Sequence, residues 1–194
     1  LIAYYRAHIL HLLSRGEESA DALSSAARNG KLCFPARLED IAVLRDAIAR
    51  NGADANACYD LGNLFYDRFR YDEAVSLWEE AIRRDPTHAE ALRNLALAYY
   101  DRRGDAASAR VCMEKALAQR HDPRLLFEYQ QLLKAMNLSV QERLDAYDRY
   151  ADLLAVRDDC WLDRIVLLSQ QGRYEEAIRA AQGRRFYIYE GGEG

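Results

Sequence analysis

The chain contains few residues of the kinds that interrupt helices or build cross-links. Its 194 residues include 3 prolines, 10 glycines and 4 cysteines. The cysteines lie far apart and form no CxxC pair: Cys33, Cys58, Cys112 and Cys160. This spacing predicts neither a disulfide framework nor a zinc site. Free thiols fit buried positions in a reducing compartment, so we expect a cytoplasmic protein.

Other features are absent as well. No apolar run approaches the roughly 18 residues that a membrane-spanning helix needs, and no signal peptide is visible. The formal net charge is -4, without a concentrated basic surface, so we expect neither nucleic acid nor a membrane as partner. The chain starts at Leu1 and ends in a glycine-rich stretch at 191–194, and we expect a piece of a longer protein.

What the chain has is an internal repeat with a period of about 34 residues. The pattern Cys58-x2-Leu61-Gly62-x2-Phe65 returns one period later as Leu92-x2-Leu95-Ala96-x2-Tyr99. A second pattern, Ala74-x3-Trp78-x2-Ala81, returns one period and one residue later as Ala109-x3-Met113-x2-Ala116. Small residues at these positions predict closely packed helix pairs, and the composition favours helix throughout.

These motifs resemble the tetratricopeptide repeat (TPR), a helix–turn–helix unit that stacks into a right-handed solenoid. The resemblance implies an all-α fold and one array over residues 1–194. The units expected are about 1–34, 55–88, 89–123, 124–157 (degenerate) and 158–185. The distance from Tyr4 to Cys58 exceeds one period by more than half of a second, so an extra helix is expected at about 36–50. His8 occupies a slot for a small residue and is expected to push the first helix pair apart.

The first helix of each unit is expected to line a concave groove. The groove residues predicted from the exposed stripes of two such helices are Asn56, Tyr59, Asn63, Tyr66, Asp67, Glu90, Arg93, Asn94, Leu97, Tyr100 and Asp101. Tyr66 and Tyr100 stand one period apart and are expected to stack on one surface. The alternative is that these tyrosines pack against the adjacent unit.

The resemblance implies a non-catalytic scaffold that binds a peptide, a protein or a neighbouring domain. No order of Ser, His, Asp or Cys suggests a catalytic residue, and an autonomous enzyme is the least favoured hypothesis. His8 and His11 lack companion ligands, so neither a metal nor a cofactor is expected. Asn63 and Asn94 loosely resemble a clamp for a C-terminal carboxylate, but Tyr59 stands in place of its first lysine. Uncovered terminal helices would allow weak homo-association.

A narrower resemblance is to the TPR region of large uncharacterised bacterial proteins, in which a β-rich domain suspected to act on carbohydrate accompanies the repeats. The segments that carry it are Cys33-Phe34-Pro35-x-Arg37-Leu38-Glu39, Leu61-Gly62-Asn63-Leu64-x-Tyr66-Asp67 and Glu190-Gly191-Gly192-Glu193-Gly194. It implies an alternative function, as a structural spacer or accessory module of a larger carbohydrate-related enzyme.

Overall fold

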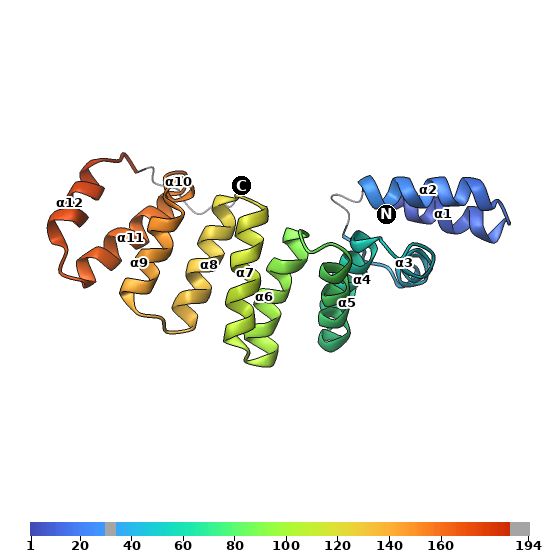
Figure 1. The fold of residues 1–194 in the computed structure, drawn as a ribbon, viewed down its shortest axis with the longest axis horizontal. Helices are drawn as coiled ribbons and strands as arrows, with labels where there is room; N and C mark the ends of the chain where they lie inside the picture. Colours follow the sequence, from blue (N-terminus) through green and yellow to red (C-terminus); the bar gives the residue numbers. More distant parts are fainter. Residues whose placement is uncertain (30–33, 187–194) are drawn as a thin grey trace. The chain divides into compact units, whose positions relative to one another are not determined.

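The computed structural model describes residues 1–29 and 34–186, and over these residues the chain forms twelve α-helices and no strand (Figure 1). The all-α prediction is therefore confirmed. None of the helices in the described residues is long and apolar enough to cross a membrane. Cys33 and the glycine-rich stretch at 191–194 lie outside the described residues. The chain divides into two compact units, Leu1–Gln119 and Arg120–Gly194, and each is described by itself.

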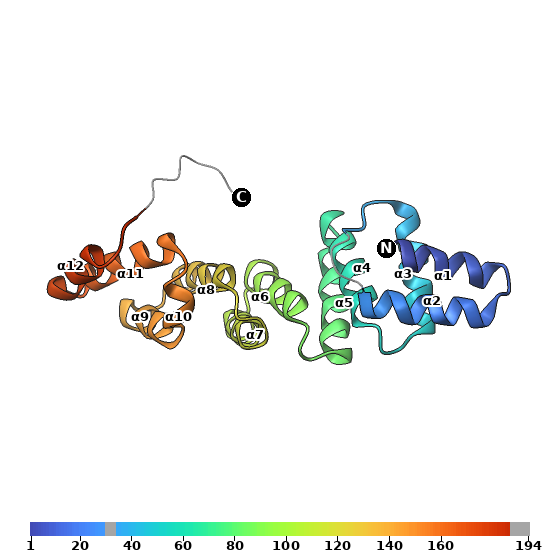
Figure 2. The ribbon, with the colours of Figure 1, turned by 90° about the horizontal axis from the view of Figure 1, so that it is seen from above.

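The first unit contains three helical hairpins and one additional helix (Figures 1 and 2). Its helices are α1 (Ile2–Leu12), α2 (Gly16–Asn29), α3 (Leu38–Arg50), α4 (Ala55–Asp67), α5 (Tyr71–Arg84), α6 (Ala89–Arg103) and α7 (Ala106–Gln119). The hairpins are α1 with α2, α4 with α5, and α6 with α7, while α3 packs on both α1 and α4. Helix α3 thus lies at the place where the spacing predicts an extra helix.

Gly62 is the point of closest approach between α4 and α5. A Cβ atom at this position would lie 2.5 Å from Trp78 Nε1 and 3.2 Å from the Ala74 carbonyl oxygen. Neither distance is compatible with an unshifted side chain or backbone, so only glycine fits the observed packing. Trp78 is itself buried, with 3% of its surface exposed. The prediction that Gly62 permits close helix packing is confirmed.

Helix α3 is held to the first hairpin by polar contacts. His8 Nδ1 lies 3.1 Å from Asp46 Oδ2 of α3, and Arg50 Nη1 donates to the same oxygen. The bulk of His8 therefore serves a contact with α3, in place of the predicted separation of the first helix pair. Within that pair, the Ser19 hydroxyl donates to the Ala7 carbonyl oxygen at 2.6 Å.

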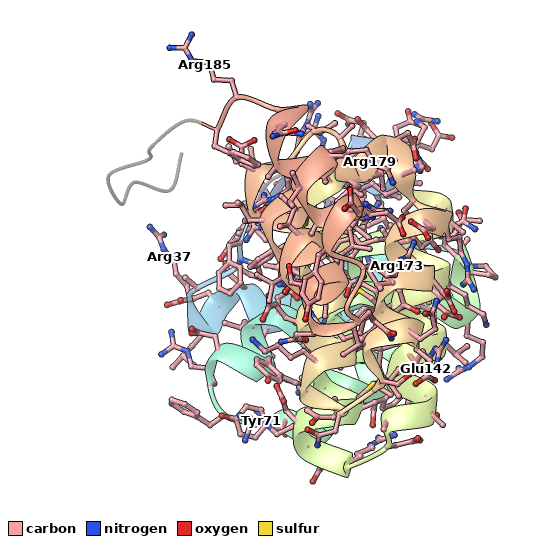
Figure 3. All side chains as sticks on the ribbon, turned by 90° about the vertical axis from the view of Figure 1, so that its left-hand side faces the viewer. Arg37, Tyr71, Glu142, Arg173, Arg179 and Arg185 are labelled. Carbon is pink, nitrogen blue, oxygen red and sulfur yellow. The ribbon has the colours of Figure 1, made fainter. Side chains whose placement is uncertain are left out.

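The segment that precedes α3 is pinned on two sides. The backbone N–H groups of Ala36 and Arg37 donate to Asp40 Oδ2, each at 2.9 Å, and the Tyr5 hydroxyl donates to Asp40 Oδ1 at 2.6 Å. Arg68 Nη2, at the end of α4, donates to the Ala36 carbonyl oxygen at 2.5 Å. Burial raises the pKa of Asp40, but the hydrogen bonds that its carboxylate accepts outweigh burial and hold this pKa below its ordinary value. The Arg37 side chain extends away from the ribbon (Figure 3).

The second unit contains α8 (Pro123–Ala135), α9 (Val140–Arg149), α10 (Ala151–Leu154), α11 (Asp158–Gln170) and α12 (Tyr174–Gln182). Ser139 caps α9 and forms a capping box with Glu142. Helices α9 and α10 are separated at Tyr150, which leaves helical geometry at φ −118° and ψ 43°. Its ring packs edge-on against Tyr129, with ring centroids 6.5 Å apart.

Candidate functional site

A pocket of about 240 Å³ lies between α4 and α6 in the first unit. The residues that line it are Phe34, Asn63, Tyr66, Asp67, Trp78, Arg93, Asn94 and Leu97. Six of them belong to the set of eleven groove residues predicted from the sequence. The structure thus brings the central part of the predicted set together on one surface.

A chain of side-chain hydrogen bonds runs across this surface. Arg93 Nη1 donates to Asn94 Oδ1 at 3.0 Å, and Asn94 Nδ2 donates to Asn63 Oδ1 at 2.9 Å. Trp78 Nε1 donates to the same Asn63 oxygen at 3.2 Å. Because an amide nitrogen carries two hydrogens, Asn94 keeps a second N–H beyond its bond to Asn63. The Asn63 oxygen accepts both bonds, whereas a carboxylate clamp would use the amide N–H groups of Asn63 as donors.

The two asparagines occupy different positions in the repeat. One period relates Asn63 to Leu97, and it relates Asp60 to Asn94. The hydrogen bond between Asn63 and Asn94 therefore joins positions that are not equivalent in the two units. Sequence spacing alone predicts neighbours at equivalent positions, so this bond had no direct signal in the sequence.

Tyr66 forms an aromatic wall with residues of its own hairpin. Its ring centroid lies 5.2 Å from that of Trp78 and 4.8 Å from that of Tyr71. The Arg102 guanidinium of α6 lies 3.8 Å from the Tyr71 ring centroid, a distance typical of cation–π contacts. Tyr66 therefore packs against rings of its own hairpin, and Arg102 is its contact from the adjacent unit. Its stacking on Tyr100 stays a prediction.

The remaining five predicted groove residues lie outside the pocket lining: Asn56, Tyr59, Glu90, Tyr100 and Asp101. Asn56 Nδ2 donates to the Ala27 carbonyl oxygen of α2 at 2.7 Å, so the first hairpin occupies its amide. The Tyr59 ring lies 4.8 Å from His88, and burial raises the pKa of its hydroxyl. Glu90 Oε2 lies 3.5 Å from His88 Nδ1. These contacts show why an exposed stripe on a helix does not translate directly into a binding surface.

His88 caps the helix that supplies part of the pocket lining. Its Nδ1 accepts a hydrogen bond from the Ala91 N–H at 3.2 Å and so caps the start of α6. The residue is buried, and this burial lowers the pKa of the imidazole. A neutral ring with Nδ1 as acceptor carries its proton on Nε2, and among the described residues Nε2 has no hydrogen-bond partner. His88 therefore fixes the helix that carries Arg93 and Asn94.

Two lining residues were not predicted as groove residues. Trp78 reaches the pocket from α5, where the repeat pattern assigns it only a packing role, but a buried indole N–H needs an acceptor and Asn63 supplies it. Phe34 reaches the pocket from the segment before α3. No local pattern could place Phe34 there, because its position depends on bonds made by residues distant in sequence.

A pair of buried carboxyl groups lies at the other end of the exposed stripe of α4. Asp54 caps the helix by accepting from the Ala57 N–H, and both of its oxygens accept from the Tyr4 hydroxyl at 3.0 and 3.1 Å. Asp60 is 3% exposed. Burial raises the pKa of Asp60 to about 7; the Leu1 amino group opposes this rise and Asp54 adds to it. This end of α4 is therefore sensitive to pH near neutrality.

Parts of this chain are similar to a known protein family and to solved structures. The model described as "TPR repeat" matches residues 62–102, from the middle of α4 to the end of α6. MamA, whose crystal structure is known, is 15% identical in sequence to this chain. The match covers 73% of this chain and 82% of the MamA chain, with a TM-score of 0.58. YrrB, described as a TPR protein with an unusual peptide-binding site, is also 15% identical in sequence to this chain. The match covers 93% of this chain and 81% of the YrrB chain, with a TM-score of 0.56.

At this identity the two structures establish the fold and nothing beyond it. The family model covers the segment that contributes all of the pocket residues except Phe34. TPR repeats are typically interaction modules without catalytic machinery. Residues 62–102 thus match a TPR repeat, and the helical fold is similar to that of solved TPR proteins, an α-solenoid of helical units.

Proposed function

We propose that this chain is a non-catalytic interaction module that binds an extended peptide segment of a partner protein on the surface of α4 and α6. The observation that carries the proposal is the pocket itself, which gathers six predicted groove residues from two helices of adjacent repeats. The proposal also draws support from the fold shared with YrrB, which is described as a TPR protein with an unusual peptide-binding site.

The chemistry of the lining fits a peptide. Asn94 offers a spare N–H donor beside an aromatic and aliphatic wall that includes Tyr66 and Leu97. An extended peptide presents backbone carbonyl groups and side chains in alternation, so one amide and one apolar pocket can engage adjacent features of it. At about 240 Å³ the pocket is smaller than the roughly 300–1,000 Å³ of small-molecule sites. It suits one side chain of a polymer better than a whole metabolite.

A direct test uses a phage-displayed library of random linear peptides selected on the purified chain. Fluorescence anisotropy with a labelled selected peptide then compares the wild type with Asn94→Ala, which removes a lining amide, and with Asp101→Ala, a control from the same helix outside the lining. We expect Asn94→Ala to weaken binding by about fivefold or more, the value of one hydrogen bond. Equal affinity for the wild type and Asn94→Ala would place the peptide elsewhere and refute the proposal.

The last hairpin favours a second candidate function, a structural module that docks on a neighbouring domain. Four large apolar side chains on α11 and α12 are about half exposed or more: Leu162, Val166, Tyr174 and Ile178. Large apolar side chains that are exposed on two adjacent helices suit an interaction surface. If a domain of the same protein covers it, substitution of Val166 and Ile178 by Ser will lower the stability of the full-length protein more than that of the present chain. Equal effects in both would refute this function.

A further inference from the structure

The position of Phe34 beside the pocket is fixed by the segment that follows it. Two backbone N–H groups of this segment, at Ala36 and Arg37, donate to the buried carboxylate of Asp40. The Ala36 carbonyl oxygen accepts from Arg68 at the end of α4. The first two bonds tie the segment to α3, and the third ties it to the end of α4, the helix that supplies Asn63 and Tyr66 to the pocket. Hydrogen bonds within the first unit therefore determine the position of Phe34.

Phe34 forms a wall of the pocket and does not fill it. The side chain is 60% exposed, and about 240 Å³ of space remains beside it. A residue that occupied the pocket as an internal competitor would be buried and would leave little volume. A large aromatic ring that stays exposed next to an open pocket gains burial when a ligand enters.

Three of the other lining residues are aromatic or aliphatic, and the charged ones already make contacts. Tyr66, Trp78 and Leu97 complete the apolar lining. The Asp67 carboxylate lies 3.6 Å from the Arg68 guanidinium, and Arg93 donates to Asn94. Among the lining residues themselves one carboxylate and one guanidinium are present, so neither sign of charge predominates in the lining. The lining therefore favours a large uncharged apolar side chain.

We infer that Phe34, with Tyr66, Trp78 and Leu97, forms the anchor subsite of the groove, and that this subsite selects one large uncharged apolar side chain of the bound peptide. The inference rests on the proposed peptide-binding function and adds to it the class of the anchor residue. It also assigns to the segment before α3, which lies outside the repeat pattern, a role in specificity.

The test uses the selected peptides in a double-mutant cycle. We expect them to share one Leu, Ile, Met or Phe, and its replacement by Ala to weaken binding about tenfold, because about 60 Å² of apolar surface stays in water. Phe34→Ala should weaken the binding of the parent peptide by a similar factor, but should leave the affinity for the Ala-substituted peptide nearly unchanged. Leu38→Ala is the matched control, because Leu38 is 72% exposed, close in sequence and outside the lining. It should change the affinity by less than about twofold.

The outcomes separate this inference from the function on which it rests. Tighter binding by Phe34→Ala would show an internal competitor, and unchanged binding would show a bystander; either result overturns the inference. If Asn94→Ala weakens binding while Phe34→Ala does not, the peptide-binding function is supported and the anchor subsite is refuted. A shared basic or acidic residue in the selected peptides would also overturn it. If no peptide is selected, both proposals fail together.

Discussion

Replacement of Gly62 by Ala tests the packing on which both the hairpin and the pocket depend. The added Cβ would lie 2.5 Å from Trp78 Nε1 and 2.6 Å from Trp78 Cδ1, against about 3.5–4.0 Å for an ordinary contact. The indole would have to retreat by about 1 Å. That movement separates Nε1 from the Asn63 oxygen, to which it now donates at 3.2 Å.

Three effects set the size of the change in the free energy of unfolding. Overpacking of a close-packed contact costs about 1–3 kcal/mol. The lost hydrogen bond between Trp78 and Asn63 adds about 1 kcal/mol. In the opposite direction, Ala is favoured over Gly inside a helix by about 1 kcal/mol. We therefore expect Gly62→Ala to destabilise the first unit by about 2 kcal/mol.

Urea denaturation followed by circular dichroism and by tryptophan fluorescence measures this change. Two probes are needed, because repeat arrays do not always unfold in one step. Gly52→Ala is the matched control, since a Cβ at Gly52 meets nothing within 4 Å and its backbone is not left-handed. This control should be as stable as the wild type or more stable by up to about 1 kcal/mol.

A Trp78→Phe background identifies the source of the effect. The phenyl ring lacks the nitrogen that the new methyl group would meet, so Gly62→Ala should cost at least about 1 kcal/mol less in this background. A Gly62→Ala protein as stable as the wild type would refute the packing argument. An undiminished cost in the Trp78→Phe background would show that the backbone near Ala74, and not the indole, limits the approach of the helices.

Three further predictions follow from burial and backbone geometry. Because the pKa of Asp60 is about 7 in the folded state against 3.8 ordinarily, the free energy of unfolding should fall as pH rises from about 4 to 7. Asp60→Asn should remove this dependence and raise the free energy of unfolding at pH 8 by at most about 4 kcal/mol, measured by urea denaturation. An unchanged pH dependence in Asp60→Asn would contradict this prediction. Phe69 is 78% exposed and has a left-handed backbone, with φ 61°, at the turn position that Gly104 occupies one unit later. Because this conformation is strained for Phe and not for Gly, Phe69→Gly should raise the free energy of unfolding by about 1 kcal/mol in the same urea assay. A lower free energy of unfolding would contradict the proposed backbone strain. Burial raises the pKa of Cys58 to about 11 and of Cys160 to about 12, so peptide mapping should find both unmodified after iodoacetamide treatment of the native protein and modified in guanidinium; rapid native labelling would refute their burial.

The repeat pattern predicted the parts of the fold that depend on local spacing. Gly62 and Ala74 recur at fixed distances because two helices must meet there, and this meeting needs no information from elsewhere in the chain. The capping box of Ser139 and Glu142 is equally local, and the structure contains it. The break at Tyr150 is not local, since it accompanies contact with Tyr129 of another helix. Helix ends that depend on such tertiary contacts escape prediction from one sequence.

The candidate site was predicted in part, for the same physical reason. The stripe of α4 and α6 residues identified the helices that supply the pocket, but not the stagger between them. That stagger pairs Asn63 with Asn94 in place of Leu97, and no periodicity reveals it. Contacts from α2 and from the cap of α6 then removed Asn56 and Tyr59 from the available surface.

Core packing and groove chemistry are coupled through one side chain. Trp78 packs against Gly62 with one edge and holds the Asn63 oxygen with its Nε1–H, and Asn63 in turn accepts from Asn94. A binding surface whose amide network is fixed by a buried indole loses little side-chain freedom when a ligand arrives, and this lowers the entropic cost of binding. Substitutions such as Gly62→Ala, which touch no ligand, should therefore weaken peptide binding at temperatures where the protein remains folded. Unchanged affinity in a folded Gly62→Ala protein would mean that the groove does not depend on the position of Trp78.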